Sequence, residues 1–89
     1  MNDRADKQEF VLNQITDSFG LRDFSGYDLS GIDLRELDLS GVNFTGADLT
    51  NANLSGAILT SAKLDRANLQ MANLRNTYMH EASFREANL

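Results

Sequence analysis

Large apolar residues recur at every fifth position along most of the chain. Counted from Phe24 in steps of five, the register reaches Leu89 without a slip. An α-helix would spread such positions around its circumference, because five residues turn it by about 500°. A straight strand would alternate them between its two faces. The pattern therefore predicts a chain that turns one corner per repeat and keeps these fourteen residues, the predicted structural core, on its inner side: Phe24, Leu29, Leu34, Leu39, Phe44, Leu49, Leu54, Leu59, Leu64, Leu69, Leu74, Met79, Phe84 and Leu89.

The other positions of each repeat agree with this geometry. Alanine stands two residues before most centres from Leu49 onward, and a spacing of two places both side chains on one side of an extended segment. The residue between them must point outward, and it is usually Asp or Asn. Two residues after the centre, Gly or Asn is frequent, as expected of a turn residue with positive φ. Six corners lack both, and there we expect a different turn type: Glu36, Ser61, Arg66, Met71, Glu81 and Glu86.

The phenylalanines indicate how many repeats complete one coil. Phe24, Phe44 and Phe84 are separated by 20 and 40 residues, and no other centre is aromatic. Four repeats per coil would bring the three rings to one side of a square coil, in a column interrupted only by Leu64. Columns of like residues bury a continuous core that no single repeat could bury alone. We therefore expect coils of 20 residues.

Residues 22–89 resemble the pentapeptide-repeat family, whose loose consensus is A(D/N)LXX. The segments "GADLT", "NANLS", "RANLQ" and "MANLR" carry the resemblance most clearly, within fourteen tandem units in register. The resemblance implies an all-β solenoid: a right-handed quadrilateral parallel β-helix, with about 3.4 coils over this range. Hexapeptide-repeat acyltransferases have a period of six and a three-sided helix, so the period of five excludes them.

Residues 1–21 precede the repeats, and we expect a short amphipathic α-helix there. Asn2 or Asp3 suits the N-cap and Gly20 suits the stop. The apolar stripe at helical spacing consists of Val11, Leu12, Ile15 and Phe19.

This N-terminal segment is expected to cap the first coil. In that coil the small inner position is filled by larger residues, so this end of the core should be wider or covered: Arg22, Tyr27, Ile32 and Leu37. A helical cap would shield the coil and its strand edges from water and from other chains. Docking of the helix on a partner or a membrane is the alternative, and acids beside Arg4 and Lys7 argue against anionic lipid.

Composition excludes several classes of protein. The chain has no cysteine, so it forms neither disulfides nor thiolate metal sites. No apolar run exceeds three residues, which predicts neither a transmembrane span nor a signal peptide, and a cytoplasmic location is the default. The net charge is −5, with ten acids and four bases in residues 1–50. Direct nucleic-acid binding is not expected, because it needs clustered Lys and Arg.

No constellation typical of an active site is evident. His80 is the only histidine, and with Glu81 beside it makes neither a metal site nor a catalytic pair. No glycine-rich phosphate loop follows a strand and opens a helix. The expectation is therefore a protein without enzymatic activity, with no catalytic, cofactor-binding or metal-binding residues and no cofactor.

Four outer residues form a candidate interaction surface: Ile58, Met71, Tyr78 and His80. Ile58 and Tyr78 occupy the slot usually held by Asp or Asn, and at a separation of twenty they should stack on one face. Met71 near a corner and His80 alongside would complete an exposed apolar patch, which would bind a protein. Ordinary variation on a tolerant surface is the alternative.

The chain stops in mid-repeat at Leu89, without a capping segment. The last coil would expose a cross-section of the core and a row of strand edges, which tend to find a partner. We expect a homodimer through this end, with Phe84, Ala87 and Leu89 as the candidate interface. A truncated piece of a longer solenoid is the alternative.

The predicted function is that of a non-enzymatic protein-interaction scaffold, a rigid rod that presents flat faces to an unidentified protein partner or to itself. The resemblance also implies an alternative, protection of gyrase and related topoisomerases by imitation of duplex DNA. About 16 Å of solenoid would correspond to roughly 9 or 10 DNA phosphates. Residues 22–89 hold nine acids and six bases, so the DNA-mimicking gyrase binder is the weaker alternative.

Overall fold

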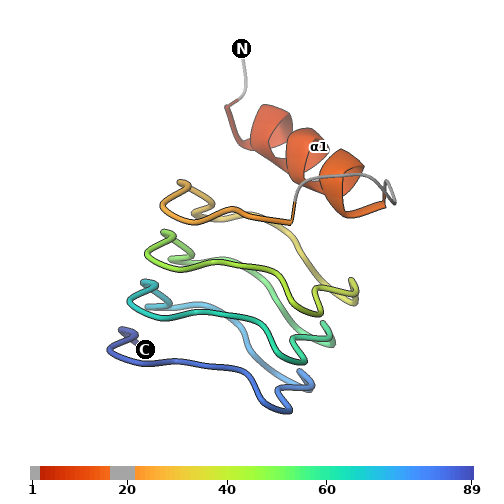
Figure 1. Ribbon diagram of the computed structural model, residues 1–89. Coiled ribbons are helices and arrows are strands. Elements are labelled where there is room, and N and C mark those ends of the chain that lie inside the picture. Colours follow the sequence, from red (N-terminus) through yellow and green to blue (C-terminus); the bar gives the residue numbers. More distant parts are fainter. Residues whose placement is uncertain (1–2, 17–21) are drawn as a thin grey trace.

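Residues 22–89 wind into a stack of coils, and one helix, α1 (Asp3–Thr16), lies across the first coil (Figure 1). This computed structural model describes residues 3–16 and 22–89. Helix α1 falls within the predicted N-terminal segment, whereas the predicted Asn2, Phe19 and Gly20 lie outside the described residues.

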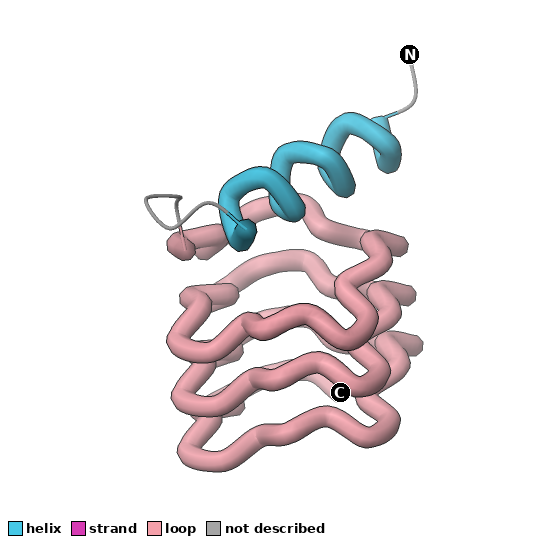
Figure 2. Tube along the Cα trace, turned by 90° about the vertical axis from the view of Figure 1, so that its right-hand side faces the viewer, coloured by secondary structure: helices cyan, strands magenta, loops and turns pink. Residues whose placement is uncertain are grey.

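Parallel pairing joins each coil to the next, at a spacing of 20 residues. Isolated bridges run from Asp23 with Asn43 to Asn68 with Asn88, which matches four repeats per coil. At each bridge one amide of the earlier coil donates to the later coil, and one amide of the later coil donates back, as between Phe24, Asn43 and Arg22. The coils therefore stack edge to edge (Figure 2). The pairs remain single bridges and do not extend into longer strands, because a corner interrupts the extended backbone in every repeat.

All corner residues from Gly26 to Glu86 have a positive φ. At the first corner the amide of Tyr27 donates to the carbonyl of Phe24 at 3.1 Å, and the positive φ falls on the third residue of the turn, as in type II.

The expectation of a different turn type at six corners was wrong. These residues have φ between 57° and 63°, which matches the asparagine corners and is close to the 68–72° of the glycine corners: Glu36, Ser61, Arg66, Met71, Glu81 and Glu86. Stacking explains the result, because each corner must follow the backbone path of its neighbours to keep the pairing between coils. A residue with a Cβ then adopts the left-handed conformation at a cost of about 1–2 kcal/mol.

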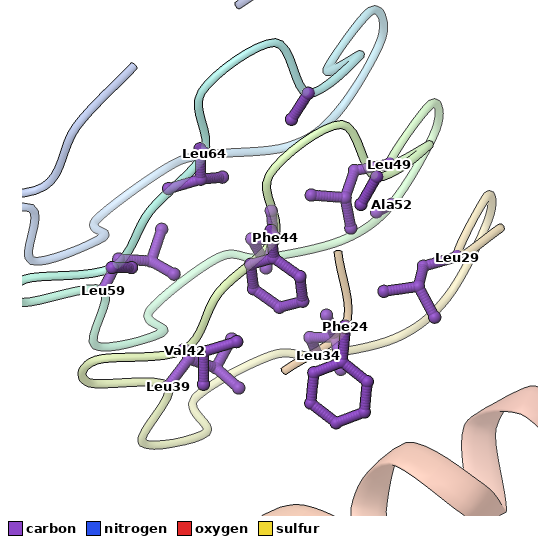
Figure 3. Packing of buried hydrophobic residues seen from close by; sticks show 14 of the residues in the cluster. Phe24, Leu29, Leu34, Leu39, Val42, Phe44, Leu49, Ala52, Leu59 and Leu64 are labelled. Atoms are coloured by element: carbon purple, nitrogen blue, oxygen red, sulfur yellow. The ribbon is translucent and has the colours of Figure 1, made fainter. Parts of the chain in front are cut away.

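The interior is a column of apolar side chains. Ten of the fourteen centres, from Phe24 to Leu69, are at most 2% exposed. Phe24 and Phe44 stack with ring centroids 6.0 Å apart, and Figure 3 shows both rings pointing into the interior. The remaining centres lie in the last coil: Leu74, Met79 and Phe84 are half-buried and Leu89 is 74% exposed.

Helix α1 packs its apolar side chains on the first coil. Val11 is fully buried, and Ile15 packs against the same core. The ring of Phe10 lies edge-on to Phe24 at 6.3 Å and stacks with Tyr27 at 6.2 Å. The aromatic column of the core thus continues into the helix.

Candidate interaction surfaces

The outward Asp and Asn residues hold the corners in place. Oδ1 of Asp38 accepts the amide N–H of Ser40 at 3.0 Å, and Oδ1 of Asn53 accepts that of Ser55 at 3.1 Å. The same bond to the residue two positions later recurs in most repeats, as an Asx-turn. The sequence indicated that these residues point outward, and the structure adds this role as acceptors.

These hydrogen bonds lower the pKa of several of the carboxyl groups. For Asp38, the hydroxyl of Ser40 and then its amide N–H hold the pKa below the ordinary 3.8. For Asp33, the main cause of the lowered pKa is the guanidinium of Arg35, which bonds both carboxylate oxygens. The pKa is lowered likewise at Asp23 and Asp28. The pKa of Asp65, which follows a core residue, is lowered by the hydroxyl of Ser83 and then the amide of Arg85 in the next coil.

Four outward positions carry neither Asp nor Asn: Ile58, Lys63, Tyr78 and Ser83. The corner after Ser83 is supported from the preceding coil, where Oδ1 of Asp65 accepts the amide of Arg85 at 3.0 Å. The amides of Thr60 and His80 follow Ile58 and Tyr78, and within residues 3–16 and 22–89 no side chain accepts from them.

Ile58 and Tyr78 lie on one face of the stack. They are joined by a parallel bridge, with Asp38 above them in the same column. Tyr78 is 64% exposed and Ile58 is half-buried. His80 is exposed at the corner that follows Tyr78, so it borders this face, which we call the Tyr78 face.

Met71 is not part of the Tyr78 face, and its inclusion in the predicted patch was wrong. It occupies the corner between the columns of Asn68 and Asn73, whereas the Tyr78 face begins one corner later. Its side chain is 82% exposed there. The reason is geometric. Each side of the coil takes one five-residue repeat, so Met71 and Tyr78, seven residues apart, lie on different sides.

The upper edge of the first coil, the head edge, is closed by side chains. Inside the stack, the amide of Asn53 donates to the carbonyl of Ile32 and its carbonyl accepts from the amide of Leu34. On the first coil, the amide of Asp33 donates to Oε1 of Gln8 at 2.7 Å, and Nε2 of Gln8 donates to the carbonyl of Asp33. A carboxamide has the donor and acceptor of a peptide group. The side chain of Gln8 therefore replaces the pairing of an absent coil.

Arg22 and Lys7 close further parts of the head edge. Nη2 of Arg22 donates to the carbonyls of Asp38 at 3.2 Å and of Ser40 at 2.8 Å. The corresponding carbonyls one coil later accept backbone amides. Nζ of Lys7 lies 3.4 Å from the carbonyl of Ser30. Sequence reasoning singled out Arg22 as too large for the interior but missed the capping role of all three side chains.

The lower edge of the last coil, the tail edge, is different. Earlier in the stack, the amide of Leu54 donates to the carbonyl of Asn73 at 2.8 Å. The corresponding amides of Leu74, Met79 and Phe84 have no acceptor in the described part of the chain. Ala87, whose amide donates to the carbonyl of Phe84, is half-buried. The tail edge therefore combines unpaired donors with partly exposed apolar side chains.

Neither a metal site nor a membrane span is found in the described residues. No group of three His, Cys, Asp or Glu side chains there is placed to hold a metal ion. Helix α1 does not have the length and apolar character needed to cross a bilayer.

Comparison with known proteins identifies the repeats. A family model for pentapeptide repeats (8 copies) matches residues 23–60 and 57–89. The chain belongs to the pentapeptide-repeat family. The resemblance seen in the sequence is thereby confirmed, and membership implies a right-handed quadrilateral β-helix, in agreement with the 20-residue pairing. Pentapeptide-repeat proteins are generally non-enzymatic structural or interaction proteins.

Two solved structures of pentapeptide-repeat proteins are similar to the chain. Rfr23 from the cyanobacterium Cyanothece 51142 is 34% identical with a TM-score of 0.53, over 74% of this chain and 42% of Rfr23. HetL from Nostoc sp. strain PCC 7120, which is involved in heterocyst differentiation regulation, is 32% identical with a TM-score of 0.57, over 85% of this chain and 42% of HetL. The chain thus spans less than half the length of either protein. None of the curated proteins matches it.

Proposed function

We propose that this pentapeptide-repeat chain is a non-enzymatic scaffold that binds a protein partner through the Tyr78 face. The observation that carries the proposal is the loss of turn acceptors at Ile58 and Tyr78. Asp or Asn at these positions would accept the amide of Thr60 or His80, and such a hydrogen bond contributes about 0.5–1.5 kcal/mol. The apolar residues therefore weaken their own corners.

The exposure of Tyr78 supports a binding role. An aromatic side chain that is 64% exposed offers a large apolar surface with a polar tip, and such residues are enriched at the centres of interfaces. Pairing between coils holds Tyr78 and Ile58 in fixed relative positions, so little order has to be gained on binding. HetL is involved in a regulatory process, which supports a regulatory use of such binding here.

The test places a photo-crosslinking residue at position 78 in the native host and, as a matched control, at position 68 on another face. We expect a specific protein captured from position 78 and not from position 68. The Ile58→Asn/Tyr78→Asn variant should fold with equal or greater stability and should lose that partner. Equal capture from both positions, or a partner retained by the double variant, would contradict the proposal.

A second surface supports self-association. We propose that the tail edges of two copies pair to form a homodimer, with Phe84, Ala87 and Leu89 at the interface. Unpaired amides and partly exposed apolar side chains on one edge favour pairing with another chain. Light scattering over a range of concentrations should show a dimer that Leu89→Lys abolishes. A monomer at high concentration would rule this interface out.

DNA mimicry is less well supported by the distribution of charge. The outward acids concentrate in the first coil, from Asp23 to Asp38, whereas later coils carry Lys63, Arg66 and Arg75. No acidic column continues along the stack as phosphates do along DNA. We expect gyrase supercoiling to be unchanged by the protein, with and without a gyrase-poisoning drug. Inhibition or protection at stoichiometric concentration would revive the alternative.

A further inference from the structure

We infer that the head edge is itself a binding site for the tail edge of a second copy, and that α1 occupies this site and prevents head-to-tail assembly. The inference rests on the proposed pairing ability of the tail edge. It assigns to α1 a role in limiting assembly, in addition to covering the core.

At the head edge, side chains bond the backbone groups that a preceding coil would otherwise pair with. Within the stack, each outward residue gives its amide to the coil before it and accepts an amide from that coil. Asp33 makes both bonds with the side chain of Gln8, and the carbonyls of Asp38 and Ser40 accept from Arg22. Elsewhere in the stack the carbonyls in the columns of Asp33 and Asp38 accept the amides of core residues: Asn53 accepts from Leu34, and Ile58 accepts from Leu39. At the tail edge, the amides of Leu74 and Met79 are the donors of the same two columns.

The apolar surfaces of the two edges also correspond. Under α1, the head edge presents Phe24, which lies 6.3 Å from the ring of Phe10. The tail edge presents Phe84, two coils below Phe44 in the same column. Val11 of α1 is fully buried, so the helix fills the position that the core of a preceding coil would take. A tail edge stacked there would continue the aromatic column.

Charge favours head-to-tail contact over head-to-head contact. The first coil carries five acids against Arg22 and Arg35, whereas residues 70–89 carry two acids and two bases. Two head edges would therefore bring like charges together, and a head edge against a tail edge would not. A head-to-tail contact joins different surfaces and does not close on itself, so it produces open rows of molecules. With α1 in place, only tail-to-tail pairing remains and growth stops at two copies.

The experiment loosens α1 in the full chain. Val11→Asp places a carboxylate in a fully buried position and should displace the helix from the first coil. Light scattering and sedimentation should then show a series of species whose mean mass rises several-fold with concentration. The matched control is Glu9→Gln, which changes an exposed residue of the same helix and should leave the mass at that of the wild type.

Further variants separate the possible outcomes. Adding Phe84→Lys and Leu89→Lys to Val11→Asp should restore a single small species, because both alter the tail edge. If circular dichroism shows that Val11→Asp is unfolded, the milder Gln8→Ala/Phe10→Ser variant takes its place. A folded variant that keeps the wild-type mass at high concentration would overturn the inference. A wild-type dimer lost in Leu89→Lys would still support tail-to-tail pairing, so the two proposals fail separately.

Discussion

Each repeat divides its work among single residues with different physical roles. The centre supplies apolar volume, the Asp or Asn before it accepts the amide of the residue after it, and the next residue, at the corner, takes a positive φ. The corner and the outward position are coupled, because the Asx-turn restrains the backbone just before the left-handed residue. Two predictions at this scale separate the roles.

The first prediction concerns Asp38 and pH. Its folded-state pKa is below 3.8 because Ser40 donates its hydroxyl and amide to the carboxylate. The unfolded chain therefore binds the proton more tightly, so the stabilisation is present above about pH 4 and is lost as pH falls through the folded pKa. Asp38→Asn keeps the acceptor oxygen without the charge, and urea unfolding between pH 2 and 7 should show a shallower acid loss of stability. An unaltered slope would argue against this role.

The second prediction concerns the strained corners. Ser61 has a φ of 60°, and the left-handed conformation costs a residue with a Cβ about 1–2 kcal/mol. Glycine removes this cost, but it costs about 0.5–1 kcal/mol because the more flexible unfolded chain loses more entropy on folding. Ser61→Gly should therefore raise the free energy of unfolding by up to about 1 kcal/mol, measured by urea denaturation. Asn51→Gly is the control and should gain less, since Asn tolerates this conformation.

At the scale of elements, side chains of α1 bond the open backbone edge of the first coil. Between its end turns the helix pairs its own amides and carbonyls internally, so there it offers only side chains to the open edge beneath it. Gln8 and Lys7 reach that edge one turn before Val11 and Ile15 cover the core. The polar side chains of the helix thus bond the backbone edge of the first coil, and its apolar side chains cover the core of the same coil.

The third prediction tests the coil-like pairing of Gln8. Gln8→Ala removes both hydrogen bonds to the backbone of Asp33, and we expect a loss of about 1–2 kcal/mol. The exchange rate of the Asp33 amide should rise in this variant, whereas that of the Asn53 amide, which keeps its backbone partner, should change little. Glu9→Ala on the exposed side of α1 serves as the control. Unchanged exchange at Asp33 would mean that Gln8 does not hold the edge.

At the scale of the whole molecule, stability follows the stack. Each coil contacts only its neighbours, so the free energy of unfolding is close to a sum over the interfaces between coils. Interior coils have two such interfaces and the last coil has one, which accounts for the rise in exposure from Leu69 at 2% to Leu89 at 74%.

The fourth prediction uses this gradient. Leu54 is fully buried between coils, and Leu54→Ala should lower the free energy of unfolding by about 2–5 kcal/mol. Leu74→Ala lies in the last coil, where the side chain is half-buried, and should cost clearly less. Leu54→Asp should prevent folding, whereas Asn53→Asp should be nearly neutral, because it keeps the acceptor for Ser55. Equal costs at Leu54 and Leu74, measured by urea unfolding, would contradict the gradient.

The sequence by itself determined the period, the inward set of residues and the family. These follow from local geometry: side chains two apart share a side of an extended segment, and a column of like residues every 20 positions needs no knowledge of distant contacts. The placement of Ile58 and Tyr78 on one face followed from the same arithmetic.

Only the tertiary structure decided the rest. Glu36 and Ser61 adopt a positive φ because the stacked neighbours impose the backbone path, against the preference of the residues themselves. Gln8 meets Asp33 across 25 positions, and Arg22 meets Ser40 across 18. Both contacts depend on how the chain sits over its own open edge, which no repeat pattern encodes.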